Sequence, residues 1–401
     1  MNFFYSIGIY SYAVIIHLAA IFNPKAKLWV NGRRNWKNNL ASFKRNELPL
    51  YWFHCASLGE FEQGRPLIEA LKAKQDCQIV VSFFSPSGYS VRKNYELSDY
   101  TFYLPIDSKS NAKYLIAALK PTKVFFIKYE FWANYIFELK KQNIPVYLIS
   151  GLFRENQVFF KWYGGFFRKV LHSFTKIFVQ NEASQKLLNT IHVPNTLSGD
   201  TRFDRVMHNA KNVKRITAIE DFIQGEKTLV IGSSWEEDER VFMPLINRPD
   251  FNYKVIIAPH EIKDKHLYRI TKSLKKKSVL YSELPSVKSE NADILIIDNI
   301  GMLMNVYQYA NIAYVGGGFK TGLHNILEPA CFGCPVIFGP KFSKFPEASL
   351  FIEQQVGFSV ATKETLEKVF KELDGKQDFN YILDYMNRQV GATAIIMRDI
   401  F

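Results

Sequence analysis

Residues 229–239 read Leu-Val-Ile-Gly-Ser-Ser-Trp-Glu-Glu-Asp-Glu and carry the clearest architectural signal in the chain. They place a short apolar run, a turn of small residues and an acidic segment one after the other. This order is typical of a buried strand leading into a helix, the repeating unit of an α/β fold. The preceding residues 206–227 are polar, so we place a domain boundary there. The predicted domains are 47–210 and 228–380, joined by a linker at 211–227.

Short apolar runs alternate with longer amphipathic segments on both sides of this stretch. The runs are rich in Val, Ile, Phe and Tyr and lack a polar–apolar alternation, which indicates strands buried on both faces of a parallel sheet. Helices are expected at 61–74 and 112–119, and a C-terminal helix at 381–401 is expected to pack back on the first domain. The prediction is therefore α/β, with two Rossmann-like domains and a ligand cleft between the carboxyl ends of their strands. The predicted strands are 50–53, 79–84, 124–127, 146–149 and 177–179, then 229–231, 255–258, 279–281, 294–297, 312–315 and 336–338.

The composition narrows the class of protein. The chain has 401 residues, too many for one ordinary core, and it is 47% hydrophobic and 22% charged, which excludes wholesale disorder. Its four Cys are too few for a disulfide-rich scaffold, and Cys331 and Cys334 lack partners for a zinc site, so we expect both in the core. The net charge of +13 suits nucleic acid, an anionic membrane or an anionic substrate, without choosing among them.

Residues 1–46 form a predicted membrane-attachment segment. Residues 3–22 carry no formal charge and are long enough to cross a bilayer, although Ser, His and Tyr interrupt the run. The basic stretch that follows would keep the protein at the cytoplasmic face and would bind anionic headgroups. The segment either spans the membrane or lies on it, and the alternative is a buried first helix of a soluble domain. The basic residues are Lys25, Lys27, Arg33, Arg34, Lys37, Lys44 and Arg45.

The first motif with chemistry is Ser57-Leu-Gly-Glu60, directly after the first predicted strand. A carboxylate at a helix start beside a ligand cleft can act as a general base, and Glu60 is the candidate. Ser-x-x-Glu is also the pattern of a capping box, in which Ser57 and Glu60 only close the helix N-terminus. The residues alone favour the cap and leave both roles open.

A glycine-rich segment is the strongest candidate for anion binding. Gly316-Gly-Gly-Phe-Lys-Thr-Gly-Leu-His324 follows a predicted strand, so its backbone N–H groups and the next helix N-terminus would approach a phosphate. Glu328, in the following helix, would hold a ribose diol by hydrogen bonds to its carboxylate. The alternative is a glycine-rich turn followed by an ordinary helix.

Two further turns fit either a phosphate contact or a purely structural role. Ser233 and Ser234 follow one strand, and His260 comes after Pro259 at the end of another. The chain has no H-E-x-x-H and no Asp-x-Asp pair, and its eight His do not cluster. We therefore predict a metal-independent site that needs no cofactor.

Taken in order, these motifs resemble those of the 3-deoxy-D-manno-octulosonic acid (Kdo) transferases, glycosyltransferases of the GT-B fold in lipopolysaccharide synthesis. The resemblance covers essentially the whole chain, including the apolar N-terminus. It is most specific from Gly322 to Pro340, which is similar to G-G-H-N-x-L-E-P-A followed by G-x-P-V-I-x-G-P. The other matching elements are Ser57-Leu-Gly-Glu60, Ser85-Pro-Ser-Gly88, Leu104-Pro-Ile-Asp107, Glu130-Phe-Trp-Ala-Asn134, Gly199-Asp-Thr-Arg-Phe-Asp204 and Gly232-Ser-Ser-Trp-Glu236.

The resemblance implies transfer of Kdo from CMP-Kdo to a lipid A precursor (lipid IVA), with inversion and with Glu60 as catalytic base. It implies attachment to the cytoplasmic face of the bacterial inner membrane, and the excess of basic residues then matches the phosphates of the acceptor and the anionic leaflet. The implied acceptor-binding residues are Ser57, Gly59, Ser85, Glu130 and Arg202. The implied donor-binding residues are Ser233, Ser234, Pro259, His260, Gly301, Gly317, His324, Asn325 and Glu328.

The sequence departs from the family pattern in three places. This chain has Lys128-Tyr-Glu130 where the family usually has Glu-Thr-Glu, and Ala133 where the family has Pro. Pro259-His260-Glu261 lacks the Arg of the family pattern P-R-H-P. The phosphate contact of that Arg would fall to His260, Lys263 or a backbone amide.

Two rival functions remain open from the sequence. One is another GT-B enzyme that uses a UDP-sugar on a lipid acceptor. The other is a non-catalytic basic protein of the membrane surface or of nucleic acid. Because the basic residues concentrate beside the apolar segment and not on a recognition helix, we expect no nucleic-acid partner.

Overall fold

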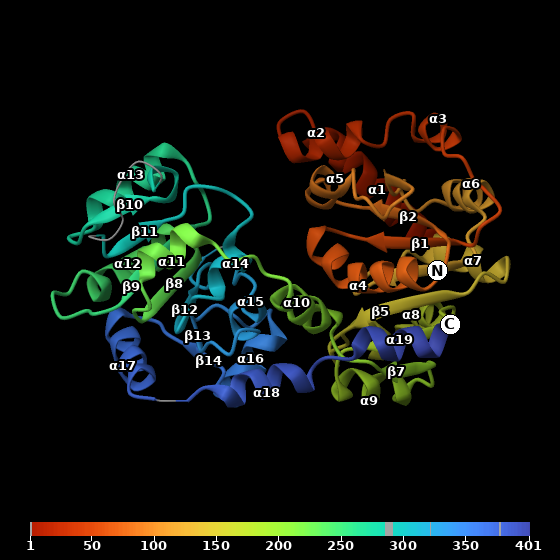
Figure 1. The fold of residues 1–401 in the computed structure, drawn as a ribbon. Helices are drawn as coiled ribbons and strands as arrows, with labels where there is room; N and C mark the ends of the chain where they lie inside the picture. The colour runs from red at the N-terminus through yellow and green to blue at the C-terminus, as the bar shows by residue number, and fades with distance from the viewer. Residues whose placement is uncertain (1, 285–291, 321, 377) are drawn as a thin grey trace. The chain divides into compact units, whose positions relative to one another are not determined.

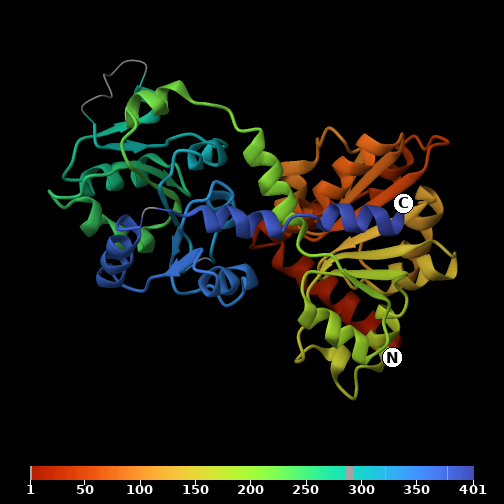
Figure 2. The same ribbon diagram turned by 60° about the horizontal axis from the view of Figure 1, so that its bottom comes forward.

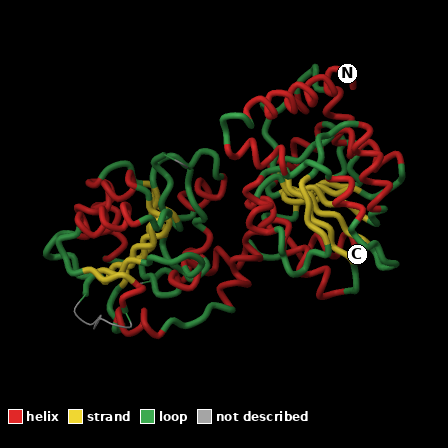
Figure 3. The backbone as a smooth tube through the Cα atoms, turned by 90° about the horizontal axis from the view of Figure 1, so that it is seen from above, coloured by secondary structure: helices red, strands yellow, loops and turns green. Residues whose placement is uncertain are grey.

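The computed structural model describes residues 2–284, 292–320, 322–376 and 378–401 (Figure 1). The chain divides into two compact units, Met1–Arg205 with Val390–Phe401, and Val206–Gln389. Each unit is built on one seven-stranded sheet, and every strand pair is parallel, as the sequence predicted. The strands of the two sheets are yellow in Figure 3. The division falls before the predicted linker 211–227, and that stretch contains the helix α11 (Thr217–Ile223), with buried Ile219 and Phe222.

The sheet of the first unit has the strand order β3-β2-β1-β4-β5-β6-β7. Its strands are β1 (Leu50–Cys55), β2 (Gln78–Phe83), β3 (Tyr100–Tyr103), β4 (Lys123–Ile127), β5 (Val146–Gly151), β6 (Lys176–Val179) and β7 (Asn195–Leu197). The helices of this unit are α1 (Asn2–Ala19), α2 (Pro24–Asn31), α3 (Trp36–Ala41), α4 (Leu58–Lys74), α5 (Pro86–Arg92), α6 (Lys109–Leu119), α7 (Ala133–Lys141), α8 (Gly165–Leu171), α9 (Glu182–Thr190) and α19 (Ala392–Ile400). The helix α10 (Thr201–Lys211) runs across the division.

Helices cover both faces of this sheet, so its central strands are buried and mostly apolar. Along β1, Trp52 packs into the core formed with α6, α7 and α8, while Tyr51 and Phe53 pack into the core formed with α4 and α19. The C-terminal helix α19 lies against α4 (Figure 2). Its start is fixed by Asp204, whose carboxylate accepts hydrogen bonds from the backbone N–H groups of Gly391 and Thr393, both at 2.6 Å.

The sheet of the second unit has the order β10-β11-β9-β8-β12-β13-β14. Its strands are β8 (Thr228–Ser234), β9 (Lys254–Pro259), β10 (Ser278–Leu280), β11 (Ile294–Ile296), β12 (Ile312–Val315), β13 (Val336–Phe338) and β14 (Gly357–Ser359). Its further helices are α12 (Glu236–Ile246), α13 (Asp264–Ser273), α14 (Leu303–Tyr307), α15 (Leu327–Ala330), α16 (Pro346–Glu353), α17 (Lys363–Asp374) and α18 (Asn380–Arg388).

The C-terminal segment and the two late cysteines can be compared directly with the predictions. The expected helix 381–401 is two helices, α18 in the second unit and α19 in the first, separated at Gly391 with φ +123°. Cys331 and Cys334 are buried free thiols, which confirms their prediction as core residues.

The N-terminal helix α1 is neither a buried core helix nor a confirmed membrane span. Large apolar side chains along α1 are exposed, including Phe4, Ile15 and Leu18 at 73%, 63% and 61%. Within the part of the chain that the structure describes, no helix combines the length and the apolar character needed to cross a membrane.

Two residues of the predicted basic stretch make hydrogen bonds within the fold. The Arg33 guanidinium stacks 3.7 Å from the centre of the Trp29 ring and donates hydrogen bonds to the carbonyl oxygens of Leu104 and Phe84, at 2.8 and 2.7 Å. Burial lowers the pKa of Arg33 to about 9. Arg45 donates to the Leu48 carbonyl oxygen at 2.6 Å. The binding of anionic headgroups by the basic stretch stays a prediction.

Candidate functional site

Glu60, the predicted base, stands in the first turn of α4, just beyond the end of β1. Its Oε2 atom accepts a hydrogen bond from the backbone N–H of Ser57 at 3.1 Å and another from the Ser57 hydroxyl. These contacts close the helix N-terminus, as the capping pattern predicted. A Cβ on Gly59 in the same turn would meet only the Ser57 hydroxyl, at 3.8 Å. Because both hydrogen bonds from the described residues use Oε2, the Oε1 atom of Glu60 remains able to accept a proton.

The loops after β2 and β4 carry Ser85 and Glu130. Both strands pair directly with β1, and neighbouring parallel strands end at one edge of the sheet, so the three loops meet there. A Cβ on Gly88 would lie 3.0 Å from the carbonyl carbon of Ser57, which shows direct contact between two of these loops. The Ser85 hydroxyl accepts from the backbone N–H of Ser87 at 3.3 Å and so begins α5.

A buried polar network fixes Glu130 at this edge. Glu130 is 8% exposed, and its carboxylate lies 3.0 Å from His54 Nε2 and accepts from Trp132 Nε1. The other ring nitrogen of His54 lies 2.8 Å from Ser82 Oγ, and His54 itself has no exposed surface. The sequence motifs assign no role to His54. The feature that could have identified it is a polar His within an otherwise apolar strand.

Two carboxylates of this edge lie near the buried thiol of Cys55. Burial raises the pKa of the Cys55 thiol, and the nearby carboxylates of Glu60 and Glu130 raise it further. Both carboxylates therefore lie within electrostatic reach of one buried thiol. An edge rich in carboxylates suits the removal of a proton from a hydroxyl group.

Asp107 joins the N-terminal helix to this part of the sheet. Its carboxylate accepts from the backbone N–H groups of Asn134 and Tyr135, both at 3.0 Å, and from the hydroxyl of Tyr5 at 2.6 Å. Burial raises the pKa of Asp107 to about 6. Because Tyr5 belongs to α1 and Asn134 to α7, this one carboxylate holds the start of α7 and anchors α1.

Arg202, a further predicted acceptor contact, lies at the same carboxyl edge of the sheet, with β4, β5 and β6 between its strand and β1. It follows β7, which is an edge strand of the sheet. Its guanidinium holds the Asp200 carboxylate through Nε at 2.9 Å and Nη2 at 2.6 Å. Asp200 also accepts from Gln63 of α4 at 3.3 Å, so Arg202 belongs to a cluster beside α4.

In the second unit, the adjacent strands β9, β8 and β12 bring most of the predicted donor residues together. The backbone N–H of His260 donates to the Ser234 carbonyl oxygen at 3.0 Å, and that of His324 donates to the Gly316 carbonyl oxygen at 3.2 Å. The loop that begins after β12 therefore folds back, so that His324 lies at the carboxyl end of the same strand. The residues gathered at this edge are Ser233, Ser234, Pro259, His260, Gly317 and His324.

Two N–H groups of the glycine-rich segment are committed to other parts of the second unit, and anion binding by the rest of the segment stays a prediction. The N–H of Gly316 donates to the Gly232 carbonyl oxygen, and that of Gly317 donates to the Asp238 carboxylate, both at 2.9 Å. These two N–H groups are therefore not available to a phosphate. The following helix α15 has only four residues, so its dipole adds little. Thr321 lies outside the described residues.

The remaining predicted donor residues are Gly301, Asn325 and Glu328, of which the last two hydrogen-bond to each other. Asn325 Nδ2 donates to Glu328 Oε1 at 3.0 Å, and its own Oδ1 accepts from the backbone N–H of Leu327 at 3.2 Å. Gly301, with φ +95°, lies in the loop after β11, which β9 and β8 separate from β12. Their contacts with a donor stay predictions.

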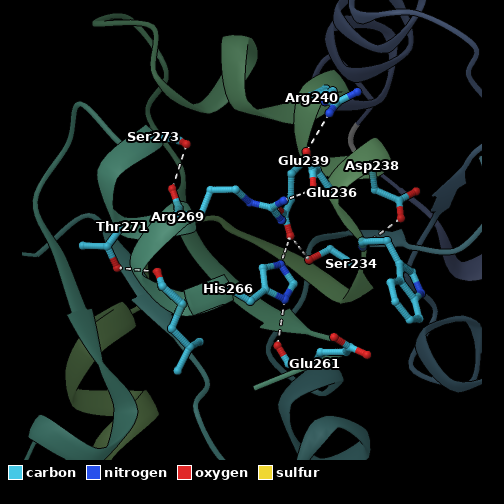
Figure 4. A network of polar contacts seen from close by, with 12 residues as sticks. Ser234, Glu236, Asp238, Glu239, Arg240, Glu261, His266, Arg269, Thr271 and Ser273 are labelled. Atoms are coloured by element: carbon cyan, nitrogen blue, oxygen red, sulfur yellow. Dashed lines mark hydrogen bonds and ion pairs between the residues drawn. The ribbon is translucent and has the colours of Figure 1, made fainter. Parts of the chain in front are cut away.

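A second polar network, which the sequence did not indicate, lies on α12 and α13 beside this edge (Figure 4). Glu239 is 5% exposed and pairs with His266 at 2.6 Å and with Arg269 at 2.7 Å. The other ring nitrogen of His266 lies 2.8 Å from the Glu261 carbonyl oxygen, which ties the loop after β9 to α12. A cavity of about 660 Å³ opens next to these residues and includes Trp235 in its wall.

Each unit is Rossmann-like, and its polar and glycine-rich loops follow the carboxyl ends of the parallel strands, where such sheets bind ligands. Two units of this kind in one chain are typical of the GT-B fold. Solved structures agree with this fold. The UDP-GlcNAc 2-epimerase from Neisseria meningitidis, bound to UDP-GlcNAc, matches with a TM-score of 0.61 at 16% identity, over 87% of this chain and 98% of that chain.

Sequence relatives define the family. Residues 34–205 match the family model of the 3-deoxy-D-manno-octulosonic-acid transferases. The transferase of that name from Chlamydophila psittaci is 30% identical over 74% of this chain and 72% of its own length. The one from Rickettsia typhi is 26% identical over 81% and 71%. The chain belongs to the Kdo transferase family and is a glycosyltransferase.

Proposed function

We propose that the protein transfers Kdo from CMP-Kdo to the lipid A precursor lipid IVA, with inversion and without a metal or a cofactor. Membership of the Kdo transferase family supports the transferred group. The observation that carries the proposal is the position of Glu60, at the carboxyl end of a central strand, with one carboxylate oxygen free of hydrogen bonds from the described residues. A carboxylate held in this way can remove a proton from an acceptor hydroxyl.

In the proposed reaction, Glu60 takes the proton of the acceptor hydroxyl. The oxygen of that hydroxyl attacks the anomeric carbon of Kdo at the same time. The bond from that carbon to the phosphate oxygen breaks, and its electron pair leaves with CMP. A single displacement of this kind inverts the anomeric centre. Ser57 holds the base in place through its two hydrogen bonds. His260, His324 and Lys263 are the proposed groups for the departing phosphate, in place of the missing Arg.

We further propose that α1 and α2 attach the protein to the cytoplasmic face of the inner membrane. Exposed apolar side chains on these helices and the turn between them form one N-terminal apolar surface: Phe4, Ile7, Tyr10, Tyr12, Val14, Ile15, Leu18, Ile21, Phe22 and Leu28. Exposed Lys25, Lys27, Arg34 and Lys37 accompany it. Apolar side chains beside cations suit a helix that lies in the headgroup region of an anionic leaflet.

The direct test is transfer by the wild-type protein in the presence of a chelator, with the products read by mass spectrometry. We expect lipid IVA to gain the mass of Kdo when CMP-Kdo is supplied. UDP-sugars supplied in parallel should give no product. Transfer from a UDP-sugar but not from CMP-Kdo would overturn the proposal in favour of another GT-B activity, and loss of transfer with the chelator would overturn the metal-free reaction.

A further inference from the structure

Three aromatic rings stack at the sheet edge of the second unit. Trp235 directly follows β8, and its ring lies 4.4 Å from that of His260, at an interplanar angle of 28°. His260 stacks in turn on His324, at 4.5 Å and 26°. Trp235 also donates a hydrogen bond from Nε1 to Nε2 of His324, at 3.1 Å. The predictions included both histidines but gave Trp235 no role.

This hydrogen bond determines which nitrogen of His324 carries the proton. An indole N–H can only donate, so Nε2 of His324 must present a lone pair. The imidazole is then neutral, with its proton on Nδ1. Burial lowers the pKa of His324 to about 4, and the neighbouring His260 contributes to the shift.

Two of the lysines that line the cavity beside Trp235 each pair with a carboxylate: Lys263 lies 2.9 Å from Glu261, and Lys320 lies 2.9 Å from Glu237. The other titratable groups beside the stack are His260, on which Glu261 acts, and Asp238, which caps α12 through the backbone N–H of Trp235 at 3.0 Å. No residue within 2–284, 292–320, 322–376 or 378–401 accepts a hydrogen bond from Nδ1 of His324. The Nδ1–H group therefore remains available to a ligand.

We infer that Trp235 is a positioning residue that fixes His324 as the neutral Nδ1–H tautomer, so that His324 offers an uncharged hydrogen-bond donor to an anionic oxygen of the nucleotide sugar. The ligand part of this inference rests on the proposed function, and the tautomer does not. In a protonated imidazole, Nε2 would also carry a hydrogen and would point it at the indole N–H. The protonated form of His324 is therefore excluded while Trp235 is in place. His324 thus contributes a directed hydrogen bond to donor recognition and no charge.

The first test reads the tautomer itself by ¹⁵N NMR of the imidazole, with the His324 signals assigned from a His324→Gln variant. In the wild type we expect protonated Nδ1 and unprotonated Nε2 from about pH 8 down to about pH 5. Trp235→Phe keeps an aromatic ring but removes the N–H, so the tautomers should mix and the pKa should move toward the usual value of about 6.5. Trp162→Phe, at a side chain that is 91% exposed, is the matched control.

The second test reads the consequence for binding. Trp235→Phe should raise the KM for CMP-Kdo about 5- to 10-fold while kcat changes less than about 2-fold, as the loss of one hydrogen bond predicts. Trp235→Gln, which restores an N–H donor, should recover part of the tautomer preference. An unchanged His324 tautomer in Trp235→Phe would overturn the inference whatever the activity. A wild type with the expected tautomer that does not use CMP-Kdo would refute the proposed function and leave the tautomer assignment standing.

Discussion

At Gly317, both the backbone conformation and the surrounding space exclude a side chain. Its φ is +90°, and a Cβ atom would lie 2.2 Å from the carbonyl oxygen of Gly322. Its N–H is committed to Asp238, so any shift of the loop also breaks that hydrogen bond. Gly317 thus has a structural role in shaping the loop that carries His324.

We expect Gly317→Ala to lower the free energy of unfolding by about 2–4 kcal/mol, because strain and a steric clash add together. Urea titration measures the loss. The matched control is Gly225→Ala, at φ +77° with nothing within 4 Å of the new Cβ, where we expect about 1 kcal/mol. Equal losses in the two variants would contradict the steric part of the argument.

His54 is the residue on which the buried network of the first unit depends. Replacing it by Phe would remove one hydrogen-bond partner from the buried Glu130 carboxylate, which keeps Trp132, and one from the buried Ser82 hydroxyl, which keeps Trp52. We expect His54→Phe to lower the free energy of unfolding by about 2–4 kcal/mol, and Ser82→Ala by about 1 kcal/mol. The two losses should add only in part in the double variant, since both remove the His54–Ser82 hydrogen bond but each also removes a contact of its own, His54–Glu130 or Trp52–Ser82. Strict additivity would show that the residues act independently.

At the scale of single elements, the start of α7 depends on one buried carboxylate. Burial raises the pKa of Asp107 from 3.8 to about 6 in the folded protein. A raised pKa means that the folded state binds the proton more tightly than the unfolded state. The contribution of this group to stability is therefore full below about pH 4 and is lost as the pH rises through about 6.

We accordingly expect the wild type to gain about 1 kcal/mol over Asp107→Asn as the pH falls from about 7 to about 5. The measurement is the difference between the unfolding free energies of the two proteins across that range, which cancels the titration of other groups. Parallel curves would show that Asp107 does not titrate there.

The N-terminal apolar surface can be tested by its affinity for lipid vesicles. Introducing charge with Ile15→Glu and Leu18→Glu together should weaken binding to anionic vesicles at least about 10-fold, because apolar burial and the attraction to headgroups are both reduced. Val91→Glu, at an exposed apolar residue of α5, is the control and should bind like the wild type. Sedimentation with vesicles measures the bound fraction. Unchanged binding in the double variant would place membrane attachment elsewhere.

At the scale of the whole molecule, burial explains which strands the sequence revealed. The central strands are covered on both faces and read as apolar runs, so each was predicted. The three missed strands, β3, β7 and β14, are all edge strands of their sheets. They are partly exposed and short, and therefore lack a continuous apolar run.

The same distinction holds for the candidate sites. Residues directly after a strand, such as Glu60 and Ser234, could be placed because strand ends are visible in the sequence. Contacts between distant segments could not, because no local pattern encodes them. Tyr5 meets Asp107 across 102 positions, and Trp235 meets His324 across 89. Such contacts set the protonation and orientation of the site residues.

The most direct test of Glu60 as the catalytic base compares Glu60→Gln with Glu69→Gln in Kdo transfer from CMP-Kdo to lipid IVA. Both changes lie on α4, and Gln at position 60 keeps an oxygen for the helix start, while Glu69 pairs only with Arg65 among the described residues. We predict a loss of about 10²- to 10⁴-fold in kcat for Glu60→Gln, with an unchanged melting temperature, and nearly full activity for Glu69→Gln. Activity of Glu60→Gln within a few-fold of the wild type would contradict the account and leave Glu60 as a helix cap.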